Sequence, residues 1–462
     1  MREQFVRLAA VNVLSNLLVP LAGLIDIAFL GHLSEVRHLA GVALATVLFN
    51  YIYWSFGFLR MGTTGITAQA MGREEPDEVL LIGLRHGMIA LLIGLGILLL
   101  QWPLKVVGFW LLSASPEVKR SGEAFYDALI WGAPATLLGF VLIGWFLGRA
   151  EGGKVLVLTA VSSSTNVILD YWLIVRLGWG SAGAGAATAI SQYLVVLVGM
   201  GLLLRELRPA HWRGMSRRGW DRLWDRLWDR VALRQLLRLN GEIFLRTLTL
   251  VTTFALFTNL SSGFGTNVLA ANTLLLQAIT FAAYFIDGLA FATESLAGLL
   301  SGRGRGGLQQ LLWLAGSLSL GLGLLFGCLY ISQSALLFGR LTRHAELLSL
   351  VQRYVIWLLP ILGFGSIAYM LDGYFLGLAQ GRILRQSSIL ATLLGFVPAA
   401  VLAWHLHNLD LLWLALTLFM LMRALTLGLN LAGTLRMACP DRLDSDAPSL
   451  GAPSANKGIP LE

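Results

Sequence analysis

An amide and a carboxylic acid stand four residues apart in the mostly apolar stretch SSTNVILDYWLIV, which runs from Ser163 to Val175. On a helix, this spacing puts the side chains of Asn166 and Asp170 on one face. A charged group inside a membrane span is costly, so it usually faces the protein interior or a water-filled cavity and marks a functional site. The oxygen atoms of these two side chains could hold a proton or a sodium ion.

Two further oxygen-bearing side chains occupy neighbouring apolar segments. Asp26 lies in the segment 7–31, and Thr188 lies in the run AGAGAATAISQ, whose small residues let helices approach closely. If Asp26 and Asp170 share one pocket, their charges repel each other and the two acids titrate as a pair, which predicts a proton switch near neutral pH. Two alternatives stay open: the four side chains hold Na⁺, or the acids are structural groups satisfied by polar neighbours.

Three more acids lie deep in later apolar segments and are secondary candidates. Asp287 and Glu294 belong to the eighth segment and Asp372 to the tenth. Each lies near a glycine or small-residue bend, so a packing role is an equally open interpretation. Few basic residues lie at comparable depth, chiefly Arg60 and Arg246. The interior is therefore predicted to be net acidic, which suits a cation.

Apolar segments that run through nearly the whole chain must position these polar groups. The 462 residues are 56% hydrophobic and only 13% charged, with a mean hydropathy of +0.72, whereas a soluble domain carries about 25% charged residues. A membrane-spanning helix needs roughly 20 mainly apolar residues. Twelve such segments are predicted, at 7–31, 38–62, 79–101, 124–148, 154–176, 181–204, 237–262, 266–300, 307–332, 347–378, 383–405 and 410–435. The predicted fold class is an all-α integral membrane protein with twelve transmembrane helices.

Basic residues are distributed unevenly between the loops on the two sides of the membrane. The loop between the sixth and seventh segments holds ten arginines, from Arg205 to Arg238. The positive-inside rule places this loop and both termini in the cytoplasm. The net charge of +8 largely reflects this loop bias, so no nucleic-acid partner is indicated. The partners expected are membrane lipids and small organic molecules, and the chain is expected to be a monomer.

The chain contains two similar halves. GWFLGRAEG, residues 144–152, is echoed 229 residues later by GYFLGLAQG, residues 373–381. Six segments in each half make the repeats parallel, as in transporters whose halves rock around a cavity near the bilayer midplane. The predicted domains are an N-lobe (1–205), a basic linker with an amphipathic helix (206–235), a C-lobe (236–436) and a disordered tail (437–462).

The linker contains WDRLWDRLWDR, a four-residue unit repeated in tandem from Trp220 to Arg230. On a helix its tryptophans lie near one face, with Asp and Arg at the flanks. This pattern is typical of a helix lying in the membrane interface. A partner-binding role is the alternative.

No motif of an enzyme or a metal site accompanies these features. Cys328 and Cys439 lie far apart without CxxC spacing, neither HExxH nor GxSxG occurs, and the histidines are isolated or lie at segment ends. The chain is not expected to be an enzyme, and no cofactor or resident metal is expected. A flippase for lipid-linked precursors remains the alternative function, although its cavity should be lined with several Arg or Lys residues.

Six longer stretches, spread in order over nearly the whole chain, carry a further signal. They are VPLAGLIDIAFLGHL (19–33), FLRMGTTGITAQAMG (58–72), NVILDYWLI (166–174), GAGAATAISQ (183–192), AYFIDGLAFATES (283–295) and YMLDGYFLG (369–377). Together they resemble the multidrug and toxic compound extrusion (MATE) family, most of all its DinF branch. The resemblance implies a MATE-like antiporter of two pseudo-symmetric six-helix lobes in the bacterial inner membrane. Such an antiporter exports organic, often cationic and lipophilic compounds in exchange for protons or sodium ions.

The resemblance also implies roles for single residues. The cation site of the N-lobe in this family matches Asp26, Asn166, Asp170 and Thr188. A fourth-helix tyrosine is loosely matched by Tyr126, and C-lobe acids of the family are matched by Glu294 and Asp372. The expected mechanism is alternating access, in which a proton from outside neutralises Asp26 or Asp170 and expels the substrate. Which lobe couples transport stays open.

Overall fold

The computed structural model describes residues 1–33, 35–112, 114–206, 225–304, 306–340 and 344–437, and within these ranges the chain is helical and forms no strand. Helices satisfy their own backbone hydrogen bonds, as a chain in hydrocarbon must. Within the described ranges, twelve helical stretches are long and apolar enough to cross a membrane: Arg2–Gly31, Val36–Gly72, Pro76–Leu99, Pro116–Gly148, Gly152–Arg176, Gly180–Arg205, Asp225–Ser262, Thr266–Gly302, Leu308–Ser332, Ala345–Gly377, Gly381–Leu406 and Leu409–Leu435. Each overlaps one predicted segment, so the predicted fold class is confirmed.

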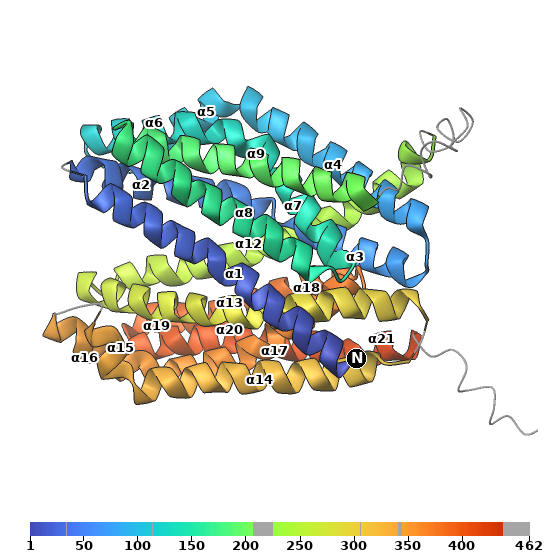
Figure 1. Cartoon of the computed structure of the whole chain (residues 1–462). Coiled ribbons are helices and arrows are strands. Elements are labelled where there is room, and N and C mark those ends of the chain that lie inside the picture. The colour runs from blue at the N-terminus through green and yellow to red at the C-terminus, as the bar shows by residue number, and fades with distance from the viewer. Residues whose placement is uncertain (34, 113, 207–224, 305, 341–343, 438–462) are drawn as a thin grey trace, which may run out of the picture.

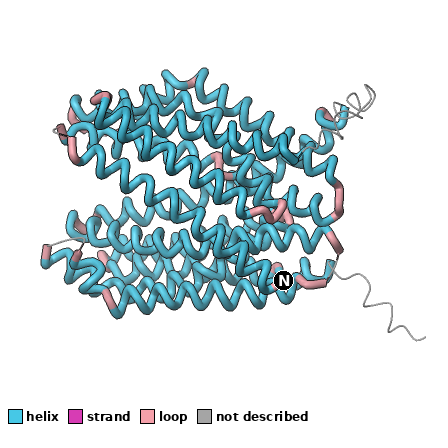
Figure 2. Tube along the Cα trace, in the orientation of Figure 1, coloured by secondary structure: helices cyan, strands magenta, loops and turns pink. Residues whose placement is uncertain are grey.

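The helices form two groups, which Figure 1 shows one above the other: the second to sixth spans lie above, the later spans lie mostly below, and α1 runs obliquely from the upper group to the lower one, where the N-terminus lies. Figure 2 shows how little of the described chain lies in loops. We call the upper group the N-lobe and the lower group the C-lobe. The N-lobe contains α1 (Arg2–Gly31), α2 (Val36–Ser55), α3 (Phe58–Gly72), α4 (Pro76–Leu99), α5 (Gln101–Leu111), α6 (Pro116–Leu129), η1 (Ile130–Gly132), α7 (Ala133–Gly148), α8 (Gly152–Asp170), the π-helical turn η2 (Tyr171–Arg176) and α9 (Gly180–Glu206). The C-lobe contains α12 (Arg230–Ser262), α13 (Thr266–Gly302), α14 (Leu308–Ser332), α15 (Ser334–Gly339), α16 (Ala345–Tyr354), η3 (Val355–Trp357), α17 (Leu358–Gly377), α18 (Gly381–Leu390), the π-helical turn η4 (Ala391–Phe396), α19 (Val397–Leu406), α20 (Leu409–Leu429) and α21 (Leu431–Met437).

The repeat found in the sequence has the same backbone geometry in both copies. Ala150 and Ala379, the second residues after the ends of α7 and α17, have positive φ angles of 57° and 54°. The N–H of Ala150 donates to the carbonyl of Leu147 at 2.8 Å, and the N–H of Ala379 donates to Leu376 at 2.9 Å. A left-handed residue just past a helix satisfies the free carbonyls of the last turn. Both lobes therefore use one way of turning from their fourth span into their fifth.

The two lobes meet most closely near the end of the bundle where α9 ends and α12 begins, which we call the linker end. Here α3 of the N-lobe packs against α13 and α17 of the C-lobe, and the Gln69 amide donates to the Gly377 carbonyl at 2.9 Å. A methyl group on Gly302 would overlap the Gln69 carbonyl and lie 2.9 Å from the Cα of Gly72. Glycine is required there because the two backbones leave no room for a Cβ atom.

Replacing Gly302 with alanine is expected to lower the free energy of unfolding by about 1–3 kcal/mol, because an extra carbon in a tightly packed seam forces the helices apart. The matched control is Gly241→Ala on α12, where a Cβ atom would meet nothing within 4 Å. This control should be neutral or stabilising by up to about 1 kcal/mol, because alanine is the better helix former. Thermal unfolding of the purified proteins in detergent measures both. Equal stability of the two variants would contradict the tight seam.

The linker is described only at its end. Residues 207–224, with two of the three tryptophans of the repeat, lie outside the described residues, as does the predicted tail from residue 438 onward. The second unit docks on α4 through Arg226: its guanidinium pairs with Glu78 at 2.9 Å, and the guanidinium of the buried Arg85 donates to the Arg226 carbonyl at 2.7 Å. The start of the C-lobe is thereby held against the third span of the N-lobe.

Candidate functional site

The two acids predicted for the N-lobe site lie together. Asp26 is carried by α1, and Asp170 is the last residue of α8, where the helix widens into the π-helical turn η2. Asp170 is fully buried, whereas Asp26 is only half-buried. Their carboxyl groups lie within hydrogen-bonding reach of each other. Apart from this contact, neither Asp170 oxygen accepts a hydrogen bond from any described residue.

This contact has a chemical consequence. Two ionised carboxylates can only accept hydrogen bonds, so a hydrogen bond between them requires one proton on one of them. The pair can therefore exist with one shared proton, and removal of that proton leaves two facing negative charges. The partial exposure of Asp26 gives an ion or a substrate access to the pair.

The amide and the hydroxyl predicted for the same site also meet. The Asn166 amide, one turn before Asp170 on α8, donates to the Thr188 hydroxyl of α9 at 3.2 Å. That hydroxyl in turn donates to the Ala184 carbonyl at 3.0 Å. Asn166 is buried and Thr188 is half-buried. The structure thus gathers the four predicted oxygen-bearing side chains where α1, α8 and α9 pack together, and we call these four residues the acid pocket.

Tyr126 is not joined to the acid pocket. Its buried hydroxyl donates to the Gln101 carbonyl at 2.9 Å, and its ring packs against Phe49 of α2 and Phe109 of α5. The loose match of this tyrosine to a site residue is therefore not supported by its contacts.

Replacing Tyr126 with phenylalanine is expected to leave the pH dependence of transport unchanged, because no contact joins its hydroxyl to the acid pocket. The loss of one buried hydrogen bond should cost about 1 kcal/mol of stability. Transport by reconstituted protein across a range of external pH measures the first effect, and thermal unfolding measures the second. A shifted pH optimum would restore Tyr126 to the site.

The C-lobe acids are held differently, by arginines. Asp372 on α17 forms ion pairs through one carboxylate oxygen with both Arg246 of α12 and Arg423 of α20. The guanidinium of Arg423 also stacks on Tyr369 at 5.3 Å. All three charged residues are buried. An acid clamped by two arginines is suited to holding three helices together, and its charge is already compensated.

The two remaining acids lie on α13 and are also close to arginines. Glu294 is fully buried and pairs at 3.5 Å with Arg60 of α3, which belongs to the other lobe and stacks on Phe291 at 4.0 Å. Asp287 is half-buried and lies within electrostatic reach of Arg60, Arg246 and Arg423. Among the described residues, none donates a hydrogen bond to Asp287.

The prediction of a net acidic interior holds only for the N-lobe. Around the C-lobe acids, three arginines (Arg60, Arg246 and Arg423) equal the three carboxylates in number. The sequence analysis did not identify Arg423, although a single arginine inside the apolar stretch LFMLMRALTL indicates a buried charge. The acid pocket is therefore the place where two carboxyl groups, one buried and one half-buried, meet without a basic partner among the described residues.

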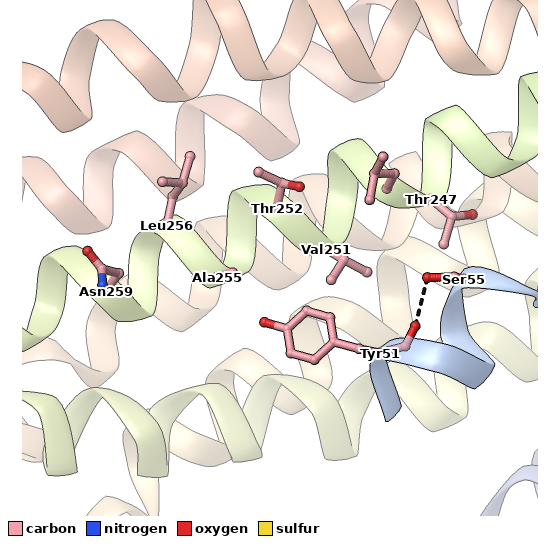
Figure 3. A pocket seen from close by; sticks show the side chains of 9 residues that line it. Tyr51, Ser55, Thr247, Val251, Thr252, Ala255, Leu256 and Asn259 are labelled. Atoms are coloured by element: carbon pink, nitrogen blue, oxygen red, sulfur yellow. Dashed lines mark hydrogen bonds between the residues drawn. The ribbon is translucent and has the colours of Figure 1, made fainter. Parts of the chain in front are cut away.

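A neutral cavity of about 420 Å³ separates the lobes between α2 and α12. Its lining carries hydroxyl and amide groups among aliphatic side chains, and no charged residue takes part. Figure 3 shows Tyr51 of α2 facing α12 across this cavity. The residues that line it are Tyr51, Ser55, Thr247, Leu248, Val251, Thr252, Ala255, Leu256 and Asn259. The sequence analysis had missed these residues, because uncharged side chains on a long apolar helix give no signal of their own.

The chain is similar to known proteins along most of its length. The MatE family model matches residues 12–172 and 243–401. The DNA damage-inducible protein F of Escherichia coli K12 is 34% identical over 425 residues, which cover 91% of this chain and 90% of that protein. A probable multidrug resistance protein NorM of Acinetobacter baylyi is 28% identical over 181 residues, or 38% of this chain and 39% of that protein.

Solved structures show the same fold. An outward-facing structure of a multidrug resistance transporter superposes with a TM-score of 0.82 at 19% identity, covering 95% of this chain and 96% of that one. A MOP superfamily transporter from Pyrococcus furiosus superposes with a TM-score of 0.80 at 20% identity, again covering 95% and 96% of the two chains. At this level of identity the likeness concerns the arrangement of the helices alone.

Proposed function

The chain belongs to the MATE family of multidrug efflux transporters, and on that premise we propose that it is a proton-coupled antiporter. It exports organic, often cationic or lipophilic compounds by alternating access. The observation that carries the proposal is the contact between Asp26 and Asp170, two carboxyl groups without a basic partner among the described residues. A neutral cavity with hydroxyl groups between the lobes suits the apolar parts of such compounds.

The mechanism follows from the charge of this pair. Without its proton the pair carries two negative charges and attracts a cationic substrate. A proton entering from outside neutralises one acid, which weakens the hold on the substrate and favours its release to the outside. A ligand shifts a two-state equilibrium only through its different affinity for the two states. Competition of proton and substrate for the same carboxylates supplies that difference.

The identity of the coupling ion is part of the proposal. Carboxylate, amide and hydroxyl oxygens also suit Na⁺, so the acid pocket could hold that ion instead. The closeness of the two carboxyl groups favours the proton, because one shared proton lets two acids approach each other, whereas Na⁺ would have to stand between two ionised acids. Sodium coupling is the alternative that the experiment must distinguish from proton coupling.

The same proposal covers the setting of the transporter. The chain is a multi-pass membrane protein. We place it in the bacterial inner membrane as a monomer, with both termini and the basic linker in the cytoplasm, because arginines concentrate at the linker end. MATE proteins are transporters, and we assign no enzymatic role to this chain.

Transport by purified protein in liposomes tests the proposal. Efflux of a fluorescent organic cation such as ethidium is followed under an imposed pH gradient, with and without sodium, and under a sodium gradient at equal pH. Uphill export driven by the pH gradient alone supports proton coupling. A requirement for sodium would change the ion, movement only downhill would indicate a channel, and transport of only an anionic lipid-linked headgroup would indicate a flippase.

A further inference from the structure

Polar side chains follow one stripe of α8 from the acid pocket toward the linker end. Asp170, Asn166, Ser163 and Thr159 succeed one another at spacings of four, three and four residues, and Gly152 at the helix start lies on the same line. Such positions fall within about 60° of one another around a helix axis. The stripe faces α1, because the Ser163 hydroxyl donates to the Leu18 carbonyl of that helix at 3.3 Å.

A second polar stripe lies on α1. It continues toward the linker end beyond Thr159, the last polar side chain of the stripe on α8. Asp26, Ser15 and Asn12 also fall within about 60° around their helix, and Ser15 and Asn12 are buried. Asn12 lies against α8, since a methyl group on Gly152 would come within 3.3 Å of its Oδ1 atom. The two helices together therefore line one strip of polar groups between the acid pocket and the linker end.

The side chain of Asn12, unpaired within the described part of the chain, indicates that water occupies this strip. Its side chain is only 1% exposed, yet neither its amide nitrogen nor its oxygen has a hydrogen-bond partner among the described residues. A buried polar group without a partner costs about 1–3 kcal/mol, and ordered water is the usual partner of such a group. Glu151, which precedes Gly152, is half-buried and pairs with Arg149 and Lys154.

The spacing of the strip suits single water molecules. Successive polar residues from Asp170 to Thr159 on α8, and Ser15 and Asn12 on α1, are three or four residues apart, which is about 4.5–6 Å along a helix. Two hydrogen bonds through one water span about 5.6 Å. The hydroxyls of Thr159 and Ser15 donate to carbonyls one turn earlier on their own helices, and that of Ser163 donates to Leu18 of α1. Each hydroxyl keeps lone pairs to accept from water.

The C-lobe repeats the scaffold of this strip without its acids and amides. The family model matches the two halves at residues 12–172 and 243–401, which sets Ile243 at the place of Asn12, Phe257 at that of Asp26 and Ala399 at that of Asp170. Thr392 and Ser388 keep hydroxyl groups at the places of Ser163 and Thr159. Phe257 is fully buried and packs against Trp413 with ring centroids 5.0 Å apart. The C-lobe thus replaces the two acids and Asn12 with apolar side chains but keeps two of the hydroxyl groups, so the acids and Asn12 are what distinguishes the N-lobe strip from the shared scaffold.

We propose that the strip between α1 and α8 is the route by which the proton leaves the acid pocket for the linker end, with Asn12 as its last polar station. The inference rests on the proposed proton coupling. The shared proton passes from the carboxyl group to a water, each water or hydroxyl accepts one proton and gives up another, and one proton reaches bulk water. The pair is left as two carboxylates, ready for the next substrate.

Two variants interrupt the route without touching the acids. Asn12→Leu removes the last polar station, and Thr159→Val removes a hydroxyl at nearly constant volume. Thr417→Val is the matched control, because this buried threonine on α20 donates to the Trp413 carbonyl just as Thr159 donates to the Val155 carbonyl. Asn12→Ser keeps a polar group and should restore most of the function.

Proton release into liposomes, driven by a gradient of ethidium and followed with a trapped pH-sensitive dye, gives the rate. We expect both route variants to slow proton release about tenfold or more, with a larger slowing in D2O. The pH dependence of ethidium binding, which reports the acid pair, should remain that of the native protein. The control should transport at the native rate.

The outcomes separate the route from the proposed function. Native rates in both route variants, together with a loss of coupling in Asp170→Asn, would overturn the route and leave proton coupling in place. Proton coupling that survives in Asp170→Asn would overturn both. If Asn12→Leu fails to fold, Thr159→Val against Thr417→Val decides the matter alone.

Discussion

Asp170→Asn is expected to abolish export driven by a pH gradient. Asparagine keeps the shape of the side chain and can still hydrogen-bond Asp26, but it cannot gain or lose a proton. The pocket then no longer alternates between two charges and one, so proton binding and substrate binding lose their link. We expect a loss on the order of a hundredfold or more in the rate of uphill transport, the size seen when a positioned proton carrier is removed.

The pH dependence provides a second readout of the same variant. Native transport needs the proton to bind on one side and to leave on the other, so its rate should fall toward both acidic and alkaline pH. In Asp170→Asn, any residual downhill movement of ethidium should vary little with pH. Transport assays in liposomes between about pH 5 and 9 cover the range in which such a carrier works.

Asp127→Asn is the matched control for the loss of one N-lobe acid. The Asp127 carboxylate is exposed and pairs with Lys105 at 2.7 Å, away from the acid pocket. It should transport like the native protein. If Asp170→Asn pumped uphill as well as this control, Asp170 would be structural, and coupling would have to lie with Asp26 or with the C-lobe.

Asp372→Asn is expected to have the largest effect on stability. The substitution leaves Arg246 and Arg423 buried and facing each other without a negative charge between them. Breaking a buried ion pair from one side costs about 3–5 kcal/mol, because an uncompensated charge stays in the interior. A large fall in the thermal midpoint in detergent, and a low yield of folded protein, should follow.

Two comparisons make this prediction specific. Asp410→Asn removes an acid from an exposed pair with Arg353, at 3.9 Å, and should cost only about 0–1 kcal/mol. Asp372→Leu combined with Arg246→Met and Arg423→Met should recover much of the stability, because apolar residues often replace a buried ion pair without loss. A stable Asp372→Asn protein that fails to transport would instead assign Asp372 to coupling.

The sequence by itself determined the membrane fold of this protein and most of one site. Hydropathy over a stretch of roughly 20 residues is a local property, and each predicted span overlaps a helix. The pairing of Asn166 with Asp170 follows from helical periodicity within one segment. Asp26 and Thr188 were also identified, because a polar group in an otherwise apolar span stands out wherever it finally packs.

Only the tertiary structure decided which side chains face one another across helices. Asp26, Asp372 and Glu294 read alike in the sequence, but the first meets a second acid, the second is clamped by two arginines, and the third pairs with Arg60 of the other lobe. Tyr126 lies beside Gln101 rather than in the pocket. The physical reason is that hydropathy and period describe one helix at a time, whereas partners across helices depend on how each helix is rotated and tilted in the bundle.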